Sequence, residues 1–132
     1  MGKKEFDLLI RNGLIVTEEK VFKGDIGIRG GKFAEVSEKI GDTAAASEID
    51  AAGMHILPGI IDSHVHADDP GRTEWETFYH VTRSLAAGGV TTFFDMPLNS
   101  IPYTNDGPAF KTKKEVADQN CVIDYALLGG VT

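Results

Sequence analysis

The 132-residue sequence contains only one cysteine, and no hydrophobic run in it reaches the length of a membrane span. Because a bilayer is crossed by about 20 consecutive apolar residues, we expect no membrane-spanning segment. Cys121 cannot form an intramolecular disulfide, which favours a reducing, cytoplasmic location, and we interpret it as a small core residue rather than a nucleophile. Asp7 and Arg11 interrupt the apolar stretch after Met1, so no secretory signal peptide is predicted.

Basic residues are fewer than acidic residues in this sequence. The chain has 13 Lys and Arg against 20 Asp and Glu, which gives a formal net charge of −7. Phosphate backbones and anionic membrane surfaces repel acidic proteins, so we expect neither a nucleic-acid partner nor a membrane partner. With 42% hydrophobic and 25% charged residues, the composition is that of a globular protein and excludes a disordered or collagen-like chain.

Short β-like segments separated by turn residues fill the first part of the chain. The segments lie at residues 6–11, 14–17, 20–29 and 32–36, with turns predicted at Asn12-Gly13, Gly30-Gly31 and Gly41-Asp42. Apolar residues recur at about every second position in residues 22–28, as in strands with one buried face. This pattern predicts a small antiparallel sheet, followed by a loop over residues 42–47 and another short strand.

From Met54 onward the sequence predicts alternating strands and helices. The elements, in order, are a strand over residues 55–66 that is buried on both faces, a helix over 76–87, a strand over 90–96, a helix over 109–120 and a strand over 121–128. Thr73 and Glu76 form a capping-box pattern at the start of the first helix, and Gly88-Gly89 ends it. This order predicts parallel strands with crossover helices, in an α/β barrel or an open doubly wound sheet.

The strongest chemical signal is His64-Val65-His66, at the end of the first of these strands. Residues i and i+2 of a strand project from the same face, so both imidazoles can converge on one metal ion while Val65 turns the other way. Active sites of α/β proteins also form at the carboxyl ends of parallel strands. We interpret the two histidines as metal ligands; the alternative is a structural, hydrogen-bonded pair.

Three longer motifs resemble the cyclic amidohydrolases of the amidohydrolase superfamily and, within that group, the allantoinases. They lie at residues 58–66, 69–76 and 88–100, and the first reads Pro58-Gly-Ile-Ile-Asp-Ser-His-Val-His. The β-rich segment before them is similar to the start of the small β-sandwich that accompanies barrels of this group. The resemblance therefore covers the whole chain.

The resemblance implies an α/β fold, namely the first strands of a (β/α)8 barrel of the TIM type. Residues 1–56 would be the N-terminal part of a composite β-sandwich domain, and residues 57–132 the first three β/α units of an incomplete barrel. A complete barrel needs about 250 residues. The family's carboxylated lysine, its other metal-binding histidines and its catalytic aspartate would lie beyond Thr132. No catalytic residue is therefore assigned within the chain, which we expect to be inactive alone.

The resemblance further implies a cytoplasmic hydrolase of purine degradation that opens the cyclic amide of allantoin to give allantoate. Two divalent metal ions, usually zinc, would activate water and polarise the amide carbonyl, and His64 and His66 would bind one of them. The partner would be a small cyclic ureide substrate, and the full-length enzyme would be a homo-oligomer, a homotetramer. The alternatives are a dihydropyrimidinase, hydantoinase or dihydroorotase activity, or a non-catalytic module.

Asp68 and Asn99 are the candidate substrate contacts. Dihydroorotases carry an arginine at the position of Asp68, where it binds the substrate's carboxylate. An acidic residue there would repel that carboxylate, which favours a neutral ureide as substrate. Asn99 offers both an amide donor and an acceptor to a ureide ring; alternatively, it organises the proline-rich loop around it.

Asp62 and Asp95 are candidates for orienting a metal-binding histidine through a hydrogen bond. Alternatively, Asp62 only ends its strand and Asp95 only caps local backbone. The second predicted helix is expected to have a solvated face, which carries Lys111, Lys113 and Lys114.

Overall fold

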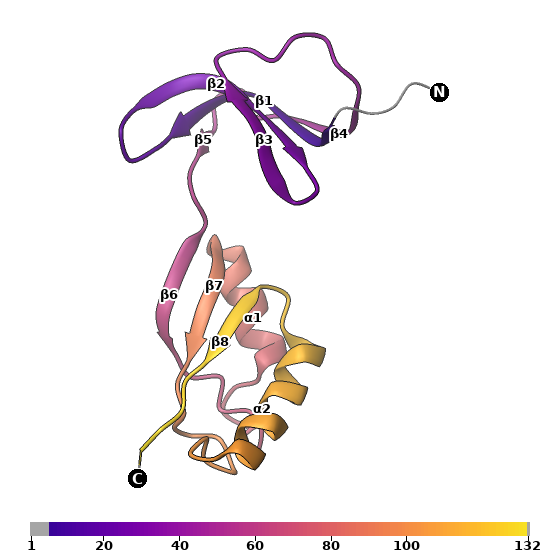
Figure 1. Cartoon of the computed structure of the whole chain (residues 1–132). Helices are drawn as coiled ribbons and strands as arrows, with labels where there is room; N and C mark the ends of the chain where they lie inside the picture. The colour runs from indigo at the N-terminus through magenta and orange to yellow at the C-terminus, as the bar shows by residue number, and fades with distance from the viewer. Residues whose placement is uncertain (1–5, 132) are drawn as a thin grey trace. The chain divides into compact units, whose positions relative to one another are not determined.

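The computed structural model describes residues 6–131 and contains two sheets (Figure 1). The chain divides into two compact units, Met1–Pro58 and Gly59–Thr132. The start of the segment on which the signal-peptide prediction rests lies outside the described residues. None of the helices within residues 6–131 is long and apolar enough to cross a membrane.

The first unit is a mixed sheet. Its strands are β1 (Phe6–Val16), β2 (Val21–Arg29), β3 (Lys32–Ser37), β4 (Ala45–Asp50) and β5 (His55–Ile56), in the order β3-β2-β1-β4, with β5 also paired to β1. The pairs β1–β2 and β2–β3 are antiparallel, but β4 and β5 run parallel to β1. The antiparallel sheet predicted for residues 6–36 is thus confirmed, and the strand that follows joins the same sheet in parallel, beginning at Ala45 within the predicted loop. After β3, at one edge of the sheet, the chain crosses to the opposite edge. There β4 pairs with β1 and runs in the same direction as β1.

The predicted turn at Asn12-Gly13 is wrong, because β1 continues through it. The pairing with β2 shifts register between Ile10 and Gly13, and Asn12 has φ 62°. The Asn-Gly pair, which tolerates positive φ, here forms a β-bulge instead of a hairpin turn. The turn predicted at Gly30-Gly31 is confirmed as the β2–β3 connection, where both glycines have positive φ.

The second unit is a three-stranded parallel sheet with crossover helices, as the sequence predicts. The strands β6 (Ile60–Val65), β7 (Val90–Asp95) and β8 (Asp124–Leu127) lie side by side in that order, connected by α1 (Phe78–Ala87) and α2 (Gly107–Asn120) (Figure 1). Side chains from the strands and both helices form one buried core, which includes Val65, Phe78, Phe93 and Ala117. Both helices therefore pack on the face of the sheet that carries Val65 and Phe93.

The predicted strand over residues 55–66 is interrupted in the structure. His55 and Ile56 pair with β1 in the first unit, and β6 begins only at Ile60. Pro58, which has no amide hydrogen for a ladder, separates the two pieces. Ile60 and Ile61 are 54% and 64% exposed, so the expected burial on both faces is wrong for this chain.

The first helix begins later than the capping-box pattern predicts. Its N-cap is Thr77, whose side-chain oxygen accepts a hydrogen bond from the His80 amide at 3.2 Å. Glu76 instead accepts from the amide of Thr77 at 2.8 Å. The predicted end of the helix is confirmed, since Gly88 is the C-cap and Gly89 follows with φ 87°.

Candidate metal centre

His64 and His66 lie at the carboxyl end of β6 with their rings together. Their Nε2 atoms are 3.3 Å apart, and the ring centroids are 5.2 Å apart. Val65 between them is 7% exposed and packs in the core under the helices. The expectation that the two imidazoles converge while Val65 turns away is confirmed, and their role as metal ligands stays a prediction.

The spacing of the two nitrogens suits one shared ion. Zinc binds imidazole nitrogen at about 2.0–2.1 Å with tetrahedral angles, which places two such nitrogens about 3.3–3.4 Å from each other. The observed separation of 3.3 Å matches this, and it also matches a hydrogen bond between the rings, the alternative for this pair. Within residues 6–131 no cluster of three or more His, Cys, Asp or Glu side chains could hold an ion. The described chain therefore offers two donors and leaves the rest of the coordination to other groups.

Asp62 and Asn99 approach the two histidines in different ways. Asp62 accepts a hydrogen bond from the backbone amide of His64 at 3.0 Å, so it contacts the backbone and not the ring. Asn99, with φ 73°, places its Nδ2 atom 3.4 Å from His66 Nδ1, the ring nitrogen that points away from His64. The structure thus brings Asn99 to the position from which it can orient the His66 ring.

Asp68 and Asp69 follow His66 by two and three residues and are both buried. Asp68 has φ 57°, is 8% exposed, and its Oδ1 atom has no hydrogen-bond partner among the described residues. Asp69 accepts a hydrogen bond from the amide of Phe78 in the first turn of α1 at 3.4 Å. Burial raises the pKa of the Asp69 carboxyl above its usual value.

Asp95, at the end of β7, is fully buried and contacts the backbone next to His66. Its Oδ1 atom accepts a hydrogen bond at 2.8 Å from the amide of Ala67, the residue after His66. Its Oδ2 atom forms an ion pair with Lys113 of α2. Burial raises the pKa of Asp95, and the Lys113 ammonium opposes part of that rise. Asp95 therefore contacts the backbone beside a histidine rather than either imidazole ring.

The prediction that all three lysines of the second helix are solvated is wrong for Lys113. Lys111 and Lys114 are exposed, but Lys113 is 1% exposed and faces Asp95. Ala109 and Ala117 lie one turn before and one turn after it, and both are buried. Positions i−4, i and i+4 share one helix face, so the three residues lie on the face of α2 that packs inward, where small alanines let the helix approach the sheet.

Cys121 behaves as the sequence predicts. It packs against the core of the second unit. Burial, followed by the nearby carboxylates of Asp95, Asp118 and Asp69, raises the pKa of its thiol to about 12. The thiol is therefore protonated at neutral pH and is a poor nucleophile.

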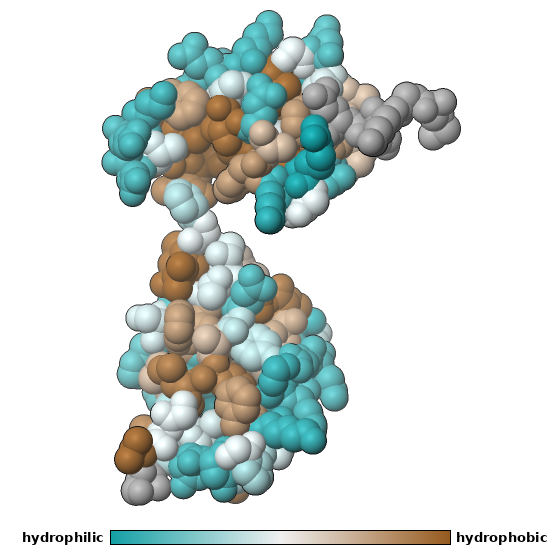
Figure 2. Space-filling view, in the orientation of Figure 1, coloured by the Kyte–Doolittle hydropathy of each residue, from teal (hydrophilic) through white to brown (hydrophobic). Residues whose placement is uncertain are grey.

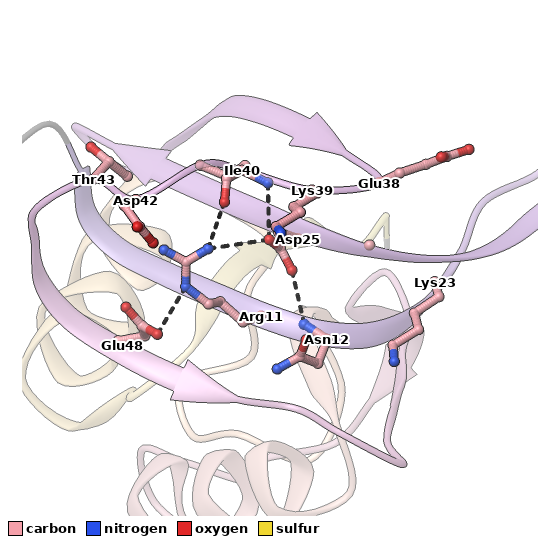
Figure 3. Close-up of a pocket in the computed structure, with 11 residues that line it drawn as sticks. Arg11, Asn12, Lys23, Asp25, Glu38, Lys39, Ile40, Asp42, Thr43 and Glu48 are labelled. Carbon is pink, nitrogen blue, oxygen red and sulfur yellow. Dashed lines mark hydrogen bonds and ion pairs between the residues drawn. The ribbon is translucent and has the colours of Figure 1, made fainter.

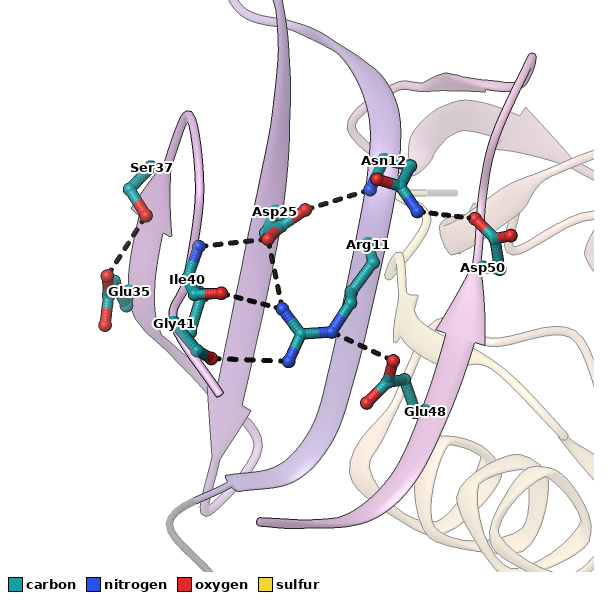
Figure 4. A network of polar contacts seen from close by, with 9 residues as sticks. All are labelled: Arg11, Asn12, Asp25, Glu35, Ser37, Ile40, Gly41, Glu48 and Asp50. Carbon is teal, nitrogen blue, oxygen red and sulfur yellow. Dashed lines mark hydrogen bonds and ion pairs between the residues drawn. The ribbon is translucent and has the colours of Figure 1, made fainter. Parts of the chain in front are cut away.

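A polar cavity that the sequence did not indicate lies in the first unit, with a volume of about 730 Å³ (Figure 3). Arg11 and Asp25 lie at its centre. The Arg11 guanidinium donates to the Ile40 carbonyl at 2.7 Å, to Glu48 at 2.9 Å and to Asp25 at 3.3 Å (Figure 4). The Arg11 guanidinium therefore connects β1 to β2, to β4 and to the segment between β3 and β4. We interpret Arg11 as a structural residue and not as a ligand-binding one.

Sequences with high similarity to this chain include allantoinases. The chain is 49% identical over 128 residues to the allantoinase of Desulfitobacterium hafniense and 45% identical over 126 residues to that of Deinococcus radiodurans. Each match covers 96% of this chain but 28% of the relative. The chain thus spans just over a quarter of the length of the relatives it matches.

Solved structures with a similar fold include two cyclic amidohydrolases. The L-hydantoinase (dihydropyrimidinase) from Arthrobacter aurescens is 35% identical with a TM-score of 0.85, over 95% of this chain and 28% of that one. The dihydropyrimidinase from Brevibacillus agri is 35% identical with a TM-score of 0.80, over 93% of this chain and 27% of that one. The fold is thus that of the N-terminal part of such barrel enzymes.

The sequence model of the amidohydrolase family matches residues 55–132, which include the histidine pair and the whole of the parallel sheet. The chain belongs to the amidohydrolase family.

Proposed function

We propose that the protein containing this chain hydrolyses the cyclic amide bond of allantoin to give allantoate, a step of purine degradation in the cytoplasm. The observation that carries the proposal is the pair of imidazole nitrogens 3.3 Å apart at the carboxyl end of a parallel strand. Its substrate assignment is supported by the similarity to allantoinases at 41–49% identity. The homotetramer implied by the resemblance belongs to this proposal.

The domain organisation is part of the same proposal. Residues 1–56 supply the N-terminal part of a composite β-sandwich, and residues 57–132 supply the first three β/α units of a TIM-type barrel. This division is supported by the separate sheets of the two units and by the change from antiparallel hairpins to parallel strands with crossover helices.

In this proposal His64 and His66 hold one of two divalent ions, most simply zinc, through their Nε2 atoms. A bound ion of this kind supplies a Lewis acid that lowers the pKa of water and polarises the amide carbonyl. Metal binding at Nε2 leaves a proton on His66 Nδ1, which orients the ring by donating to the Asn99 side-chain oxygen once that amide is turned to present its oxygen in place of Nδ2. Asp62 fixes the backbone of His64. The chain's own contribution is thus to present two imidazoles in a set geometry.

Asp68 and Asn99 remain the proposed substrate contacts. An allantoin ring presents several N–H groups, which need acceptors. The Oδ1 atom of Asp68, two residues after His66, has no partner among the described residues and would be such an acceptor once its buried side chain turns toward the substrate. The same negative charge disfavours a substrate that carries a carboxylate, such as dihydroorotate.

The test uses the full-length protein encoded by the reading frame that contains these residues. We expect hydrolysis of allantoin, with a kcat/KM well above that for hydantoin, dihydrouracil or dihydroorotate. His66→Ala should lose most of this activity together with bound metal. A preference for hydantoin or dihydrouracil would instead support the second candidate, a hydantoinase or dihydropyrimidinase, which the structural similarity to the L-hydantoinase favours.

The remaining alternative is a non-catalytic module. It predicts a stop codon directly after Thr132 and no hydrolysis of any of the four compounds. A reading frame that continues into further strands with histidines and a lysine would contradict it.

A further inference from the structure

We propose that Lys113 is a positioning residue of the metal centre, which acts with Asp95 to hold the backbone beside His66 and the loop that carries Asn99. The inference deepens the proposed function, and it rests on that function for its kinetic readout. Both residues contact backbone and loop groups rather than the histidine rings, so the proposed effect is indirect.

Three oxygen atoms surround the Lys113 ammonium, one as an ion-pair partner and two as hydrogen-bond acceptors. They are the Oδ2 atom of Asp95, the backbone carbonyl of Met96 at 2.8 Å and the hydroxyl of Ser100 at 3.3 Å. The side chain is 1% exposed, and Asp95 and Ser100 are 0% and 4% exposed. The ammonium is therefore held by two hydrogen bonds and one ion pair that are shielded from water.

These contacts join the ends of two neighbouring strands. Asp95 receives Lys113 on one carboxylate oxygen and the amide of Ala67 on the other, at 2.8 Å. The amide of Met96 donates to the carbonyl of Val65 at 2.8 Å. The backbone on both sides of His66 is thus fixed to the end of β7, where Lys113 supports Asp95 and Met96.

The same ammonium also contacts the loop between β7 and α2 at two points. Met96 begins this loop and Ser100 lies within it, and Asn99 lies between these two residues with φ 73°. The Asn99 amide reaches His66 Nδ1 at 3.4 Å. Removal of Lys113 would release the loop segment between Met96 and Ser100, so we expect the Asn99 contact to weaken.

Stability alone gives little reason for a buried ion pair at this position. Burial of two charges costs desolvation energy, and well-packed apolar residues are often as stable or more stable. An apolar pair, however, could not donate to Met96 or Ser100, nor accept from the Ala67 amide. The directional contacts around the histidines are what distinguish this pair from the exposed Lys114–Asp118 pair on the same helix.

The decisive variant combines Lys113→Met with Asp95→Asn in the full-length protein. It removes both charges together and so avoids a buried unpaired carboxylate, while the introduced side-chain amide keeps an acceptor for the Ala67 amide. We expect Tm of the metal-free protein to stay within a few degrees of the parent, and competition with a chelator to show zinc held about tenfold more weakly. KM for the cyclic amide should also rise. The exposed control Lys114→Met should change none of these quantities.

Ser100→Ala provides an independent variant that leaves the ion pair intact. It removes one contact between Lys113 and the loop, and we expect a smaller loss of zinc affinity with unchanged Tm. If the double variant does not fold, the zinc affinity of Ser100→Ala alone decides whether Lys113 has a positioning role.

Zinc affinity and KM equal to those of the parent in the folded variants would overturn the inference and leave the pair a purely structural one. Absence of activity toward every cyclic amide in the parent would overturn the proposed function instead. The zinc measurement would still test the role of Lys113 in that case.

Discussion

Asp25 joins three parts of the first unit through one carboxylate. Its Oδ1 atom accepts from the amide of Asn12 at the β1 bulge, and its Oδ2 atom accepts from the amide of Ile40, each at 2.9 Å (Figure 4). Arg11 adds an ion pair at 3.3 Å. Burial raises the pKa of Asp25, but the two amides and the guanidinium outweigh burial, so the pKa lies below its usual value.

The lowered pKa predicts that acid weakens the first unit. The unfolded carboxyl titrates near pH 3.9, so the stabilisation from Asp25 is complete above that pH and is lost as pH falls through the lower folded pKa. Asp25→Asn should destabilise this unit by about 1–3 kcal/mol at neutral pH, because an amide group cannot accept both backbone bonds and the ion pair. Hydrogen exchange in β1 and β2 measures this loss.

Hydrogen exchange measured over a series of pH values tests whether Asp25 causes the acid sensitivity. In Asp25→Asn the exchange rates, corrected for intrinsic pH dependence, should rise less steeply below pH 4 than in the parent. An identical acid response in both proteins would show that Asp25 does not carry the titration. Asp50, whose pKa is also lowered but which lies on the surface, offers the matched control Asp50→Asn, with a smaller expected effect.

At the level of elements, α1 offers a direct comparison of two threonines. Thr77 caps the helix in the structure, whereas Thr73 is the residue that the capping-box pattern indicates. Thr77→Ala should cost about 1 kcal/mol, which corresponds to about fivefold faster hydrogen exchange of the amides in the first helical turn. Thr73→Ala should leave exchange there unchanged, because Thr73 is exposed and lies before the helix. Equal effects of the two substitutions would contradict the observed cap.

The elements show where sequence reasoning succeeds and where it does not. Hydrophobic periodicity predicts the parallel strands, both helices and the convergence of His64 and His66, because these depend on spacing along the chain. The Asn12-Gly13 pair is different, since positive φ suits a turn and a bulge equally and the pairing with β2 decides between them. Thr73 and Thr77 are both good caps, and the choice depends on how Phe78 packs in the core.

Lys113 illustrates a further limit of sequence reasoning. A lysine among other charged residues suggests a solvated face, and only the position of Asp95 on a strand distant in sequence makes burial favourable. The sequence likewise leaves the roles of the candidate site residues untested. His64, His66, Asn99 and Asp68 come from the resemblance and from spacing, and their proposed chemistry depends on groups outside the chain.

At the scale of the whole molecule, both units leave apolar surface uncovered. In the first unit, Phe33 and Val36 are 74% and 45% exposed, and hydrophobic residues gather across the visible face of its sheet (Figure 2). They border an apolar groove of about 580 Å³ that also includes Ile26 and Leu57. In the second unit, β6 and β8 are edge strands within the described residues. Such surfaces and edges favour association with other chains.

We therefore expect the 132-residue chain, expressed alone, to self-associate. Ile60 and Ile61 of the edge strand β6 are more than half exposed, and an apolar edge strand can pair with the same strand of another copy. Light scattering across a concentration series should show species larger than a monomer. Ile61→Lys should reduce their fraction, because a charge on an edge strand disfavours pairing, whereas Val131→Lys, at a fully exposed position beyond β8, should not. A monomeric chain with a single cooperative thermal transition would show that the two units bury enough apolar surface without further strands.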